Sequence, residues 1–299
     1  MEEKILGTLS TTGTPDYEEV QISIEHIGQS HLRRNVILSV AAVFAVAFLI
    51  LAGIYVYSYV KAITIPDLPV STNDAENIAK LSASSSVQDG STPGVTLTTD
   101  SINQVPFNLY HLHGLSAELT YECPSQSDNT IYLYSFCADY RADNGQTIGD
   151  CIIRGRHQGK GRLRTGYLAA NGGNMVIGVS TTSEVCDFCR EHEGYFFRQF
   201  ALVSAGQVGD IRLKGKVHRR ALARTDSDEF YYIQSLNRES LYDFSEAIAD
   251  YGFTDAIYLT GGDAQGFYRD STGTAHTIGN PTILSTDHKL LYLVFKAKK

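Results

Sequence analysis

The longest apolar run in the chain lies near its N-terminus. From Val36 to Tyr57 it reads VILSVAAVFAVAFLILAGIYVY, 22 residues without a charged side chain. At about 1.5 Å of rise per residue, a helix of this length spans the ~30 Å hydrocarbon core of a bilayer. A buried core helix is rarely apolar on every face for so long, and a cleaved signal peptide would start earlier and end in a small-residue cleavage site. The pattern therefore predicts one transmembrane helix within residues 35–60.

The flanks of this run predict its orientation. His31, Arg33 and Arg34 precede it, whereas Lys61 follows it. Basic residues favour the cytoplasmic side, so we expect a cytoplasmic N-terminus and a C-terminal domain that is periplasmic or extracellular. The tail, residues 1–34, is acidic, polar and too short to build a core.

The segment after the apolar run has a different composition from the rest of the chain. Residues 61–105 contain a stretch rich in Ser, Thr, Asp and Gly, which includes SASSSVQDGSTPGVTLTTDS. Such a composition does not bury enough apolar surface to fold, so it predicts a stalk. Regular apolar patterning starts near Pro106 and predicts one domain over residues 106–299.

This outer domain consists mainly of short apolar or alternating runs, which are typical of β-strands. The predicted strands are 130–137, 148–154, 162–170, 175–180, 196–204, 219–224, 230–236, 256–260 and 289–296. The first two flank Asp143-Asn144-Gly145, which suits a three-residue hairpin loop with its glycine in the left-handed conformation.

One helix is predicted in the domain, at 240–251. In SLYDFSEAIADYG the apolar positions form one helical stripe, and Gly252 supplies a left-handed stop. With the strands 230–236 and 256–260 this helix forms a βαβ unit, a connection that is right-handed in nearly all proteins. Because many hairpins surround it, the predicted class is α+β, a mixed β-sheet domain with few helices, preceded by a single transmembrane helix.

Composition and charge narrow the classes of partner. The chain has 299 residues, 43% of them hydrophobic, which is enough for one good-sized core and an additional segment. Its 33 acidic residues outnumber its 25 lysines and arginines, and the formal net charge is −8. An acidic chain without a basic block is a poor binder of nucleic acid. With 18 tyrosines and no tryptophan, stacking on a sugar would rely on Tyr or Phe.

The first candidate for chemistry is the end of the strand 256–260, where the chain reads LTGGDAQG. A strand that follows a crossover helix opens at its carboxyl end into the ligand crevice. Gly261 and Gly262 would let the backbone approach a ligand closely. Asp263 is a candidate acid, base or acceptor for a sugar hydroxyl. The alternative is a glycine-rich turn in which Asp263 is only a turn residue.

Two further candidates lie upstream. Asn171-Gly172-Gly173-Asn174 falls between two predicted strands, and Asn-Gly is first of all a hairpin turn. Arg219 and Arg220 open another strand. Arginines at a strand start are usually solvated, but a guanidinium group is also a natural bidentate clamp for a phosphate.

The order of these three motifs resembles that of the phosphodiester glycosidase family, whose best-known members remove N-acetylglucosamine from a phosphodiester. Asn171-Gly172-Gly173 matches the family's turn, RRALA at 219–223 approximates its Arg-Thr-Ala-Ile-Gly strand start, and FSEAIADYGFTDAIYLTGG at 244–262 matches its helix and strand. The resemblance covers roughly residues 162–297 and suggests a divergent, bacterial-type member. The family's acid before the two glycines is Thr260 here, and its aromatic pair after the first turn is Asn174-Met175. Because Thr260 cannot ionise, a carboxylate role passes to Asp263 or is lost.

The resemblance implies hydrolysis of a glycoside or sugar-1-phosphodiester in envelope or extracellular glycans. Asp263 would be the catalytic acid or base, and Arg219 would neutralise the phosphate as charge develops on the leaving group. The substrate-binding residues it implies are Asn171, Gly172, Gly173, Asn174, Arg220, Thr260, Gly261 and Gly262. No cofactor is expected, and no motif supports a divalent metal. The alternative is a non-catalytic glycan-binding or scaffolding module of the cell envelope with the same fold.

The five cysteines leave several states open. Cys186 and Cys189 have the CxxC spacing of redox sites, and with His192 they could offer three zinc ligands, but a local disulfide or free thiols are the alternatives. The three-residue loop would place Cys137 directly opposite Cys151, which makes a disulfide between them a hypothesis. Because five is an odd number, at least one cysteine lacks an intrachain partner.

Two smaller groups also have metal-ligating side chains. His111 and His113 lie on one face of a strand and could share a metal, although exposed strand histidines are the simpler interpretation. Asp226, Asp228 and Glu229 could hold calcium, with a solvated hairpin tip as the default.

Overall fold

The computed structural model describes residues 17–63, 71–84, 92–141, 143–159, 164–209, 214–280 and 290–298, with side chains described from residue 34 to 57 in the first range. The chain divides into two compact units, residues 1–63 and 64–299. Each unit is described by itself below. The first 16 residues of the predicted tail, and residues 64–70 and 85–91 of the predicted stalk, lie outside the described ranges.

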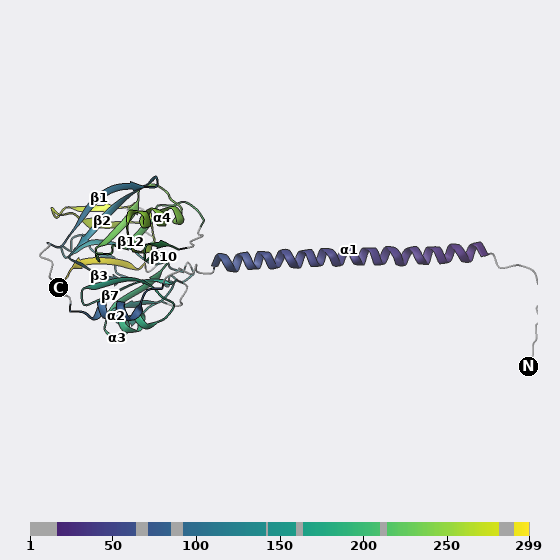
Figure 1. Ribbon diagram of the computed structural model, residues 1–299, viewed down its shortest axis with the longest axis horizontal. Coiled ribbons are helices and arrows are strands. Elements are labelled where there is room, and N and C mark those ends of the chain that lie inside the picture. Colours follow the sequence, from purple (N-terminus) through teal and green to yellow (C-terminus); the bar gives the residue numbers. More distant parts are fainter. Residues whose placement is uncertain are drawn as a thin grey trace, which may run out of the picture. The chain divides into compact units, whose positions relative to one another are not determined.

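The described part of the first unit is one long helix, α1 (Tyr17–Ile63), drawn in purple in Figure 1. Its segment Arg34–Tyr57 has a mean hydropathy of 2.8 and no buried side chain, and it is long and apolar enough to cross a membrane. Large apolar side chains such as Phe44 and Leu49 are about as exposed as they can be in a helix, at 71% and 69%. The helix predicted within residues 35–60 is therefore present, and it is apolar on all sides.

In its described ranges, the second unit contains three β-sheets. The seven-stranded sheet has the order β1 (Gly94–Ile102), β2 (Val105–His113), β13 (Phe230–Ser235), β12 (Arg220–Arg224), β14 (Asp255–Leu259), β10 (Ala201–Ser204) and β11 (Gln207–Val208). One five-stranded sheet has the order β16 (Ala275–Ile278), β15 (Gly266–Arg269), β4 (Ile131–Phe136), β17 (Tyr292–Ala297) and β3 (Leu115–Thr120). The other has the order β6 (Arg156–His157), β5 (Cys151–Ile153), β9 (Tyr195–Gln199), β7 (Gly166–Asn171) and β8 (Asn174–Val179).

Among the described residues of this unit, three helices accompany the sheets: α2 (Asp74–Ser82), α3 (Glu184–Glu191) and α4 (Leu241–Tyr251). Neighbouring strands are antiparallel wherever the structure describes a ladder, for example between β12 and β14. The predicted α+β class is confirmed.

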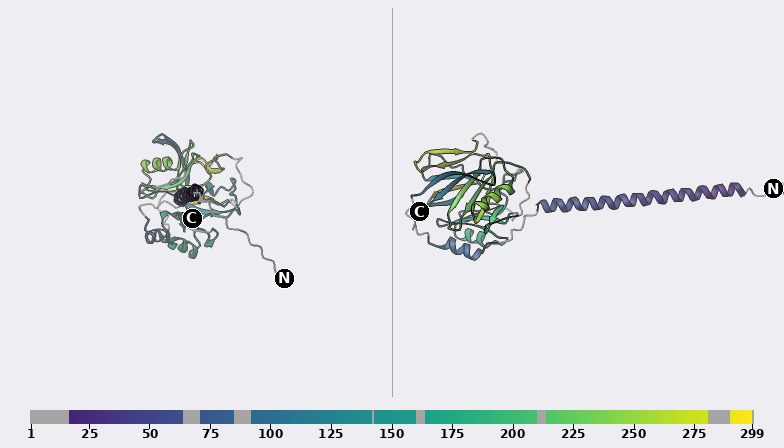
Figure 2. Two further views of the ribbon diagram at one scale, coloured as in Figure 1. Left: turned by 90° about the vertical axis from the view of Figure 1, so that its right-hand side faces the viewer. Right: turned by 45° about the horizontal axis from the view of Figure 1, so that its top comes forward.

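The core lies where the three sheets meet. Its central cluster takes side chains from all of them, such as Tyr232 on β13, Phe295 on β17 and Phe197 on β9. On the opposite face of the seven-stranded sheet α4 packs through Phe244 and Ile248. The opposite face of the sheet with β7 is covered by α2 and α3. Figure 1 shows α4 in the half of the domain with β1 and β12, and α2 and α3 in the half with β7; Figure 2 shows the same halves from two other sides.

The predicted βαβ unit is confirmed as β13, α4 and β14. Both strands pair antiparallel with β12, which lies between them, so they run parallel to each other. The helix begins where the Ser240 hydroxyl accepts the backbone N–H of Asp243 at 3.0 Å, and it ends at Gly252 with φ 109°. An isolated helix of 11 residues would be marginal in water, so the buried stripe on the sheet, at roughly 1.5–3 kcal/mol per large apolar side chain, is what holds it.

The hairpin predicted around residues 143–145 is wrong. The strands β4 and β5 lie in different sheets, and the chain between them forms only a bridge between Tyr140 and Thr147, with Arg141 N–H donating to the carbonyl of Gln146 at 2.8 Å. The Tyr140–Thr147 pairing differs by one residue from the register of a three-residue loop. The strand β4 pairs with β15 and β17 rather than with β5. Cys137 and Cys151 are consequently not a cross-strand pair, and both are buried free thiols.

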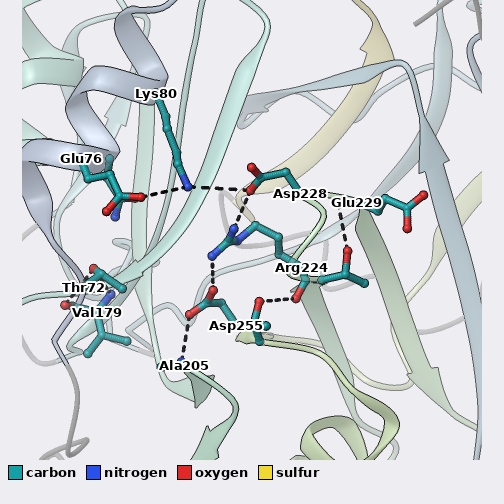
Figure 3. Close-up of polar contacts among 12 residues, drawn as sticks. Thr72, Glu76, Lys80, Val179, Ala205, Arg224, Asp228, Glu229 and Asp255 are labelled. Atoms are coloured by element: carbon teal, nitrogen blue, oxygen red, sulfur yellow. Dashed lines mark hydrogen bonds and ion pairs between the residues drawn. The ribbon is translucent and has the colours of Figure 1, made fainter.

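The stalk predicted over residues 61–105 is also wrong for most of its length. Residues 71–84 attach to the domain, because Thr72 N–H donates to the carbonyl of Val179 and Val179 N–H donates to the Thr72 hydroxyl, both at 2.9 Å. Figure 3 shows this contact, and it shows Lys80 of α2 between Glu76 and Asp228. The strand β1 pairs with β2 over nine residue pairs. The composition of this segment alone predicts no core. The segment is nevertheless held on the domain by backbone pairing and by a few buried side chains such as Leu81.

Candidate functional site

The turn after β14 is held in place by close packing around its glycines. Gly261 has φ 85°, and a Cβ at this position would lie 3.1 Å from that of Ala264. A Cβ on Gly262 would lie 1.7 Å from the carbonyl oxygen of His218, so only glycine fits. The two glycines therefore let the turn lie directly against the start of β12, and they leave Asp263 at the surface.

A cavity of about 250 Å³ opens at this end of β14. Its lining consists of Phe136, Ala138, Tyr140, Thr260, Gly261, Asp263, Ala264, Leu290 and Leu291. Among the described lining residues, most are apolar, and the polar side chains are those of Tyr140, Thr260 and Asp263. The Asp263 side chain is 46% exposed, and the Nε2 atom of His218 lies 3.8 Å from its Oδ1 atom. A small cavity with an accessible carboxylate is a suitable place for a ligand with hydroxyl groups.

Beside the cavity, four polar side chains form a closed ring of hydrogen bonds, which we call the Asp139 ring (Asp139, Arg164, Gln199 and Thr260). The Thr260 hydroxyl donates to Oδ1 of Asp139 at 2.6 Å and accepts from Nε2 of Gln199 at 3.1 Å. Arg164 donates through Nε to Oε1 of Gln199 and through Nη2 to Oδ2 of Asp139, both at 3.3 Å. The Arg164 guanidinium also lies over the ring of Phe200, 3.8 Å from its centre. The ring thus places a carboxylate next to Thr260.

Arg219 is buried one strand away from Thr260. Its Nε donates to the carbonyl of Glu239 at 2.9 Å and its Nη2 to the carbonyl of Gly215 at 2.8 Å. The guanidinium lies 6.0 Å from the ring centre of Tyr258, which is on β14 two residues before Thr260. Burial raises the pKa of the Tyr258 phenol, and the positive charge of Arg219 opposes this shift. Arg219 is thus near the site, but most of its hydrogen bonds go to the backbone.

Arg220 points to the opposite face, because successive residues of a strand alternate between faces. It is fully buried in the core. Its Nη2 donates to the carbonyl of Ala264 at 2.6 Å and its Nη1 to the Ser135 hydroxyl at 3.3 Å. The residue predicted to bind substrate therefore lies beneath the turn 260–264 and supports it from inside.

The turn Asn171-Gly172-Gly173-Asn174 joins β7 to β8, as its hairpin interpretation predicts, with φ 55° and 90° at its glycines. Gly166, at the other end of β7, pairs with Gln199 of the Asp139 ring, so the turn lies about 17 Å from the ring along the strand. Asn171 and Asn174 donate to the carbonyls of Leu81 and Ala83, at 3.4 and 2.7 Å. The structure does not bring these predicted binding residues together with Asp263. Asn171, Gly172 and Gly173 border a separate cavity of about 310 Å³.

The other motifs do not form a site. Cys186 and Cys189 lie on α3, both are buried free thiols, and burial raises the pKa of Cys186 to about 11. The rings of His111 and His113 are in contact, with 3.7 Å between their centres, and Asp228 contacts Arg224 and Lys80 (Figure 3). Within the described ranges, no three His, Cys, Asp or Glu side chains are arranged to hold a metal ion.

Sequence reasoning missed three members of the Asp139 ring. Asp139 follows β4, Arg164 precedes β7, and Gln199 ends β9. No motif marks them, because Asp139 and Thr260 are 121 residues apart and meet only when the ends of β4 and β14 lie side by side, with Thr260 N–H donating to the carbonyl of Cys137 at 3.2 Å. Their common signal is a polar side chain at a strand end, which is too general to identify a site.

No protein-family model and no curated protein matches this sequence. Among solved structures, the chain is similar to the catalytic domain of zebrafish N-acetylglucosamine-1-phosphodiester alpha-N-acetylglucosaminidase, determined in a form auto-inhibited by its pro-peptide. The TM-score is 0.51, the identity is 11%, and the match covers 73% of this chain and 87% of that one. The chain thus has a glycosidase catalytic domain as a distant structural neighbour. At this identity the likeness shows the fold alone.

Proposed function

We propose that this protein is a membrane-anchored hydrolase that cleaves a glycoside or sugar-1-phosphodiester in envelope or extracellular glycans. The observation that carries the proposal is the cavity at the end of β14, where the carboxylate of Asp263 is accessible between apolar walls. The fold shared with a glycosidase catalytic domain supports the class of reaction. Substrate binding at the carboxyl end of a strand that follows a crossover helix is also the usual arrangement.

The proposed reaction adds water across the bond between the anomeric carbon and the phosphate oxygen. A water oxygen bonds to the anomeric carbon while the bond from this carbon to the phosphate oxygen breaks. The electron pair of the broken bond leaves with the phosphate. Asp263, with His218 beside it, donates a proton to the departing oxygen, and the attacking water loses one of its own protons as its oxygen bonds to the carbon. Arg219 contributes positive potential from behind Tyr258 as negative charge develops on the phosphate. Tyr140 supplies an aromatic wall for the sugar.

The test uses the full chain in detergent, incubated with a panel of sugar-1-phosphodiesters that differ in sugar and aglycone. Asp263→Asn should lower the rate of sugar release about a hundredfold, since a positioned acid typically contributes that much. Asp143→Asn is the matched control, because Asp143 is an exposed carboxylate that pairs with Arg141 at the surface. Equal release by the Asp263→Asn variant would exclude this residue, and absence of release by the folded wild-type protein would contradict the hydrolase.

A second candidate is a glycan-binding or scaffolding module with the same fold. The positions of the two arginines favour it. Two nitrogens of Arg219 donate hydrogen bonds to the carbonyls of Glu239 and Gly215, and Arg220 is fully buried. Neither guanidinium is therefore free to clamp a phosphate at the surface. Calorimetric titration with the same panel distinguishes a hydrolase from a binding module. A binding module would bind a panel compound without cleaving it, and its affinity would be unchanged by Asp263→Asn.

In the proposal α1 anchors the domain in a membrane, with the N-terminus cytoplasmic and the domain periplasmic or extracellular. The apolar segment Arg34–Tyr57 and the basic residues that precede it support this arrangement. Resistance to extraction by alkaline carbonate tests the anchor, and protease access to a tag at the C-terminus of intact cells tests the orientation. Release of the protein from membranes by carbonate would contradict the anchor. A tag that stays protected when protease is added outside intact cells would contradict the orientation.

A further inference from the structure

A feature of the turn after β14 is that its own sequence lacks an acid at position 260, while a carboxylate from a distant segment lies against it. Thr260 donates to Asp139 at 2.6 Å, which is within the 2.5–2.7 Å range of hydrogen bonds to carboxylate oxygens. Ala138 and Tyr140, the neighbours of Asp139 on both sides, line the cavity together with Thr260. Asp139 is not itself among the described lining residues, and its carboxylate is joined to the cavity wall through the Thr260 hydroxyl.

Every hydrogen bond of the Asp139 ring has a defined direction. Arg164 only donates, Gln199 and Thr260 each accept one bond and donate the next, and both oxygens of Asp139 accept. Two accepting oxygens are the arrangement of a carboxylate rather than a carboxylic acid. Because Phe200 covers the Arg164 guanidinium and its backbone N–H donates to Gln199 Oε1 at 3.0 Å, the ring is fixed from outside as well. Asp139 is therefore held in one orientation.

The Asp139–Arg164 pair is more exposed than two deeply buried Asp–Arg pairs of the domain. The Asp139 side chain is 28% exposed, whereas Asp150 beside Arg198 is 12% exposed and Asp255 beside Arg224 is 5% exposed. A purely structural pair gains little from such access to solvent. A carboxylate that takes a proton from water needs it.

We propose that Asp139 supplies the catalytic carboxylate that position 260 lacks, and that Thr260 is the positioning residue that holds it. This inference rests on the proposed hydrolase function. Asp139 accepts a proton from the attacking water as the water oxygen bonds to the anomeric carbon, and Asp263 returns a proton to the leaving phosphate oxygen. The two carboxylates then act in one displacement, in which one water molecule is consumed and the carbon–oxygen bond is broken.

The first test compares Asp139→Asn with wild type in the full chain. We expect kcat to fall by about a hundredfold or more with a small change in KM, since a positioned base contributes about 10²–10⁴-fold. Asp143→Asn, which removes the carboxylate of the neighbouring exposed ion pair, should keep full activity.

The second test concerns Thr260. Thr260→Val removes the hydroxyl at nearly constant volume and should lower kcat about tenfold, whereas Thr260→Ser keeps the hydrogen bond to Asp139 and should retain activity. A third variant exchanges the two residues, with Asp139→Thr and Thr260→Asp together. In this variant the carboxylate is at position 260 and the hydroxyl is at position 139, so the hydrogen bond between the two positions can still form. The variant should be at least tenfold more active than Asp139→Thr alone.

The outcomes separate this inference from the proposed function. No release by wild type overturns both, whereas release by wild type with Asp139→Asn within threefold of it overturns the inference alone. If Asp139→Asn fails to fold, as judged by its melting temperature, the exchange variant decides. An active exchange variant supports the transfer of the carboxylate, and a folded but inactive one overturns it.

Discussion

Arg220 donates a hydrogen bond from its Nη2 atom to the backbone carbonyl of Ala264 at 2.6 Å, from inside the core. A Cβ on Gly279 would lie 2.6 Å from the same nitrogen, so the chain passes close to the guanidinium on this side as well. Within the described residues the Nε atom of Arg220 has no hydrogen-bond partner. The side chain therefore supports the turn that carries Asp263, and the described acceptors of its hydrogen bonds, the Ala264 carbonyl and the Ser135 hydroxyl, are neutral.

We predict that Arg220→Met lowers the free energy of unfolding by about 1–3 kcal/mol, because the Ala264 carbonyl and the Ser135 hydroxyl lose their donor in a buried place. The urea midpoint measures this change. Arg141→Met is the matched control, since Arg141 pairs with Asp143 at the surface and its loss should change the stability by less than about 0.5 kcal/mol. An Arg220→Met midpoint equal to that of wild type would contradict the supporting role.

Asp74 attaches α2 to the domain. Its carboxylate accepts from three hydroxyl groups, those of Tyr167 at 3.0 Å, Ser180 at 2.5 Å and Thr182 at 2.7 Å. Asp74→Ala would leave these donors without their acceptor in a buried place, so we predict a loss of about 3 kcal/mol in the free energy of unfolding. Glu76→Ala, on the same helix but exposed, should cost well under 1 kcal/mol. Equal melting temperatures for the two variants would show that residues 71–84 are not an integral part of the domain.

The fold could be predicted where the sequence pattern is local. The helix α4 and its stop at Gly252 follow from a stripe of apolar residues and one left-handed glycine, and the adjacent strands follow from their β-branched and aromatic runs. The strand β1 could not be predicted, because most of its side chains are exposed and its order comes from backbone pairing with β2. The strands β4 and β5 are adjacent in sequence but lie in different sheets, because each buries an apolar side chain in the shared core from its own sheet.

The candidate site shows the same division. The sequence predicts the turn at Gly261 and Asp263, because glycines and a carboxylate stand next to each other. It does not predict Asp139, since only the assembled sheets bring this residue to Thr260. Sequence order also suggests that Arg219 and Arg220 act together, but strand alternation sends their side chains to opposite faces.

The cysteines allow a test of the thiol state. All five are free, and Cys123 is exposed whereas Cys137, Cys151, Cys186 and Cys189 are buried. We predict that one thiol reacts rapidly with an aromatic disulfide reagent at pH 8 in the folded protein, and that five react after unfolding in guanidinium. Peptide mapping should identify the fast thiol as Cys123. Three reactive thiols after unfolding would instead indicate one disulfide, for which the Cys137–Cys151 hypothesis would have to be reconsidered.

The buried thiols also predict how stability depends on pH. Burial raises the pKa of Cys151 and Cys189 to about 12 and of Cys186 to about 11, and it also raises the pKa of Cys137. In the unfolded chain a thiol titrates near pH 8.5. Above that pH the unfolded state has lost protons that the folded state still holds, so the unfolded state binds fewer protons and rising pH favours unfolding.

The stability provided by these thiols is therefore complete below about pH 8.5 and is lost as the pH rises towards 12. Each thiol that titrates only in the unfolded chain removes about 1.4 kcal/mol per pH unit. Urea midpoints between pH 8 and 9.5 measure the slope before tyrosines contribute to it, since a tyrosine in the unfolded chain titrates near pH 10. Replacing Cys137 and Cys151 together by alanine should halve the slope, even though the cavities lower the stability at every pH. A wild-type midpoint that stays constant over this range would mean that these thiols are not buried in the folded domain.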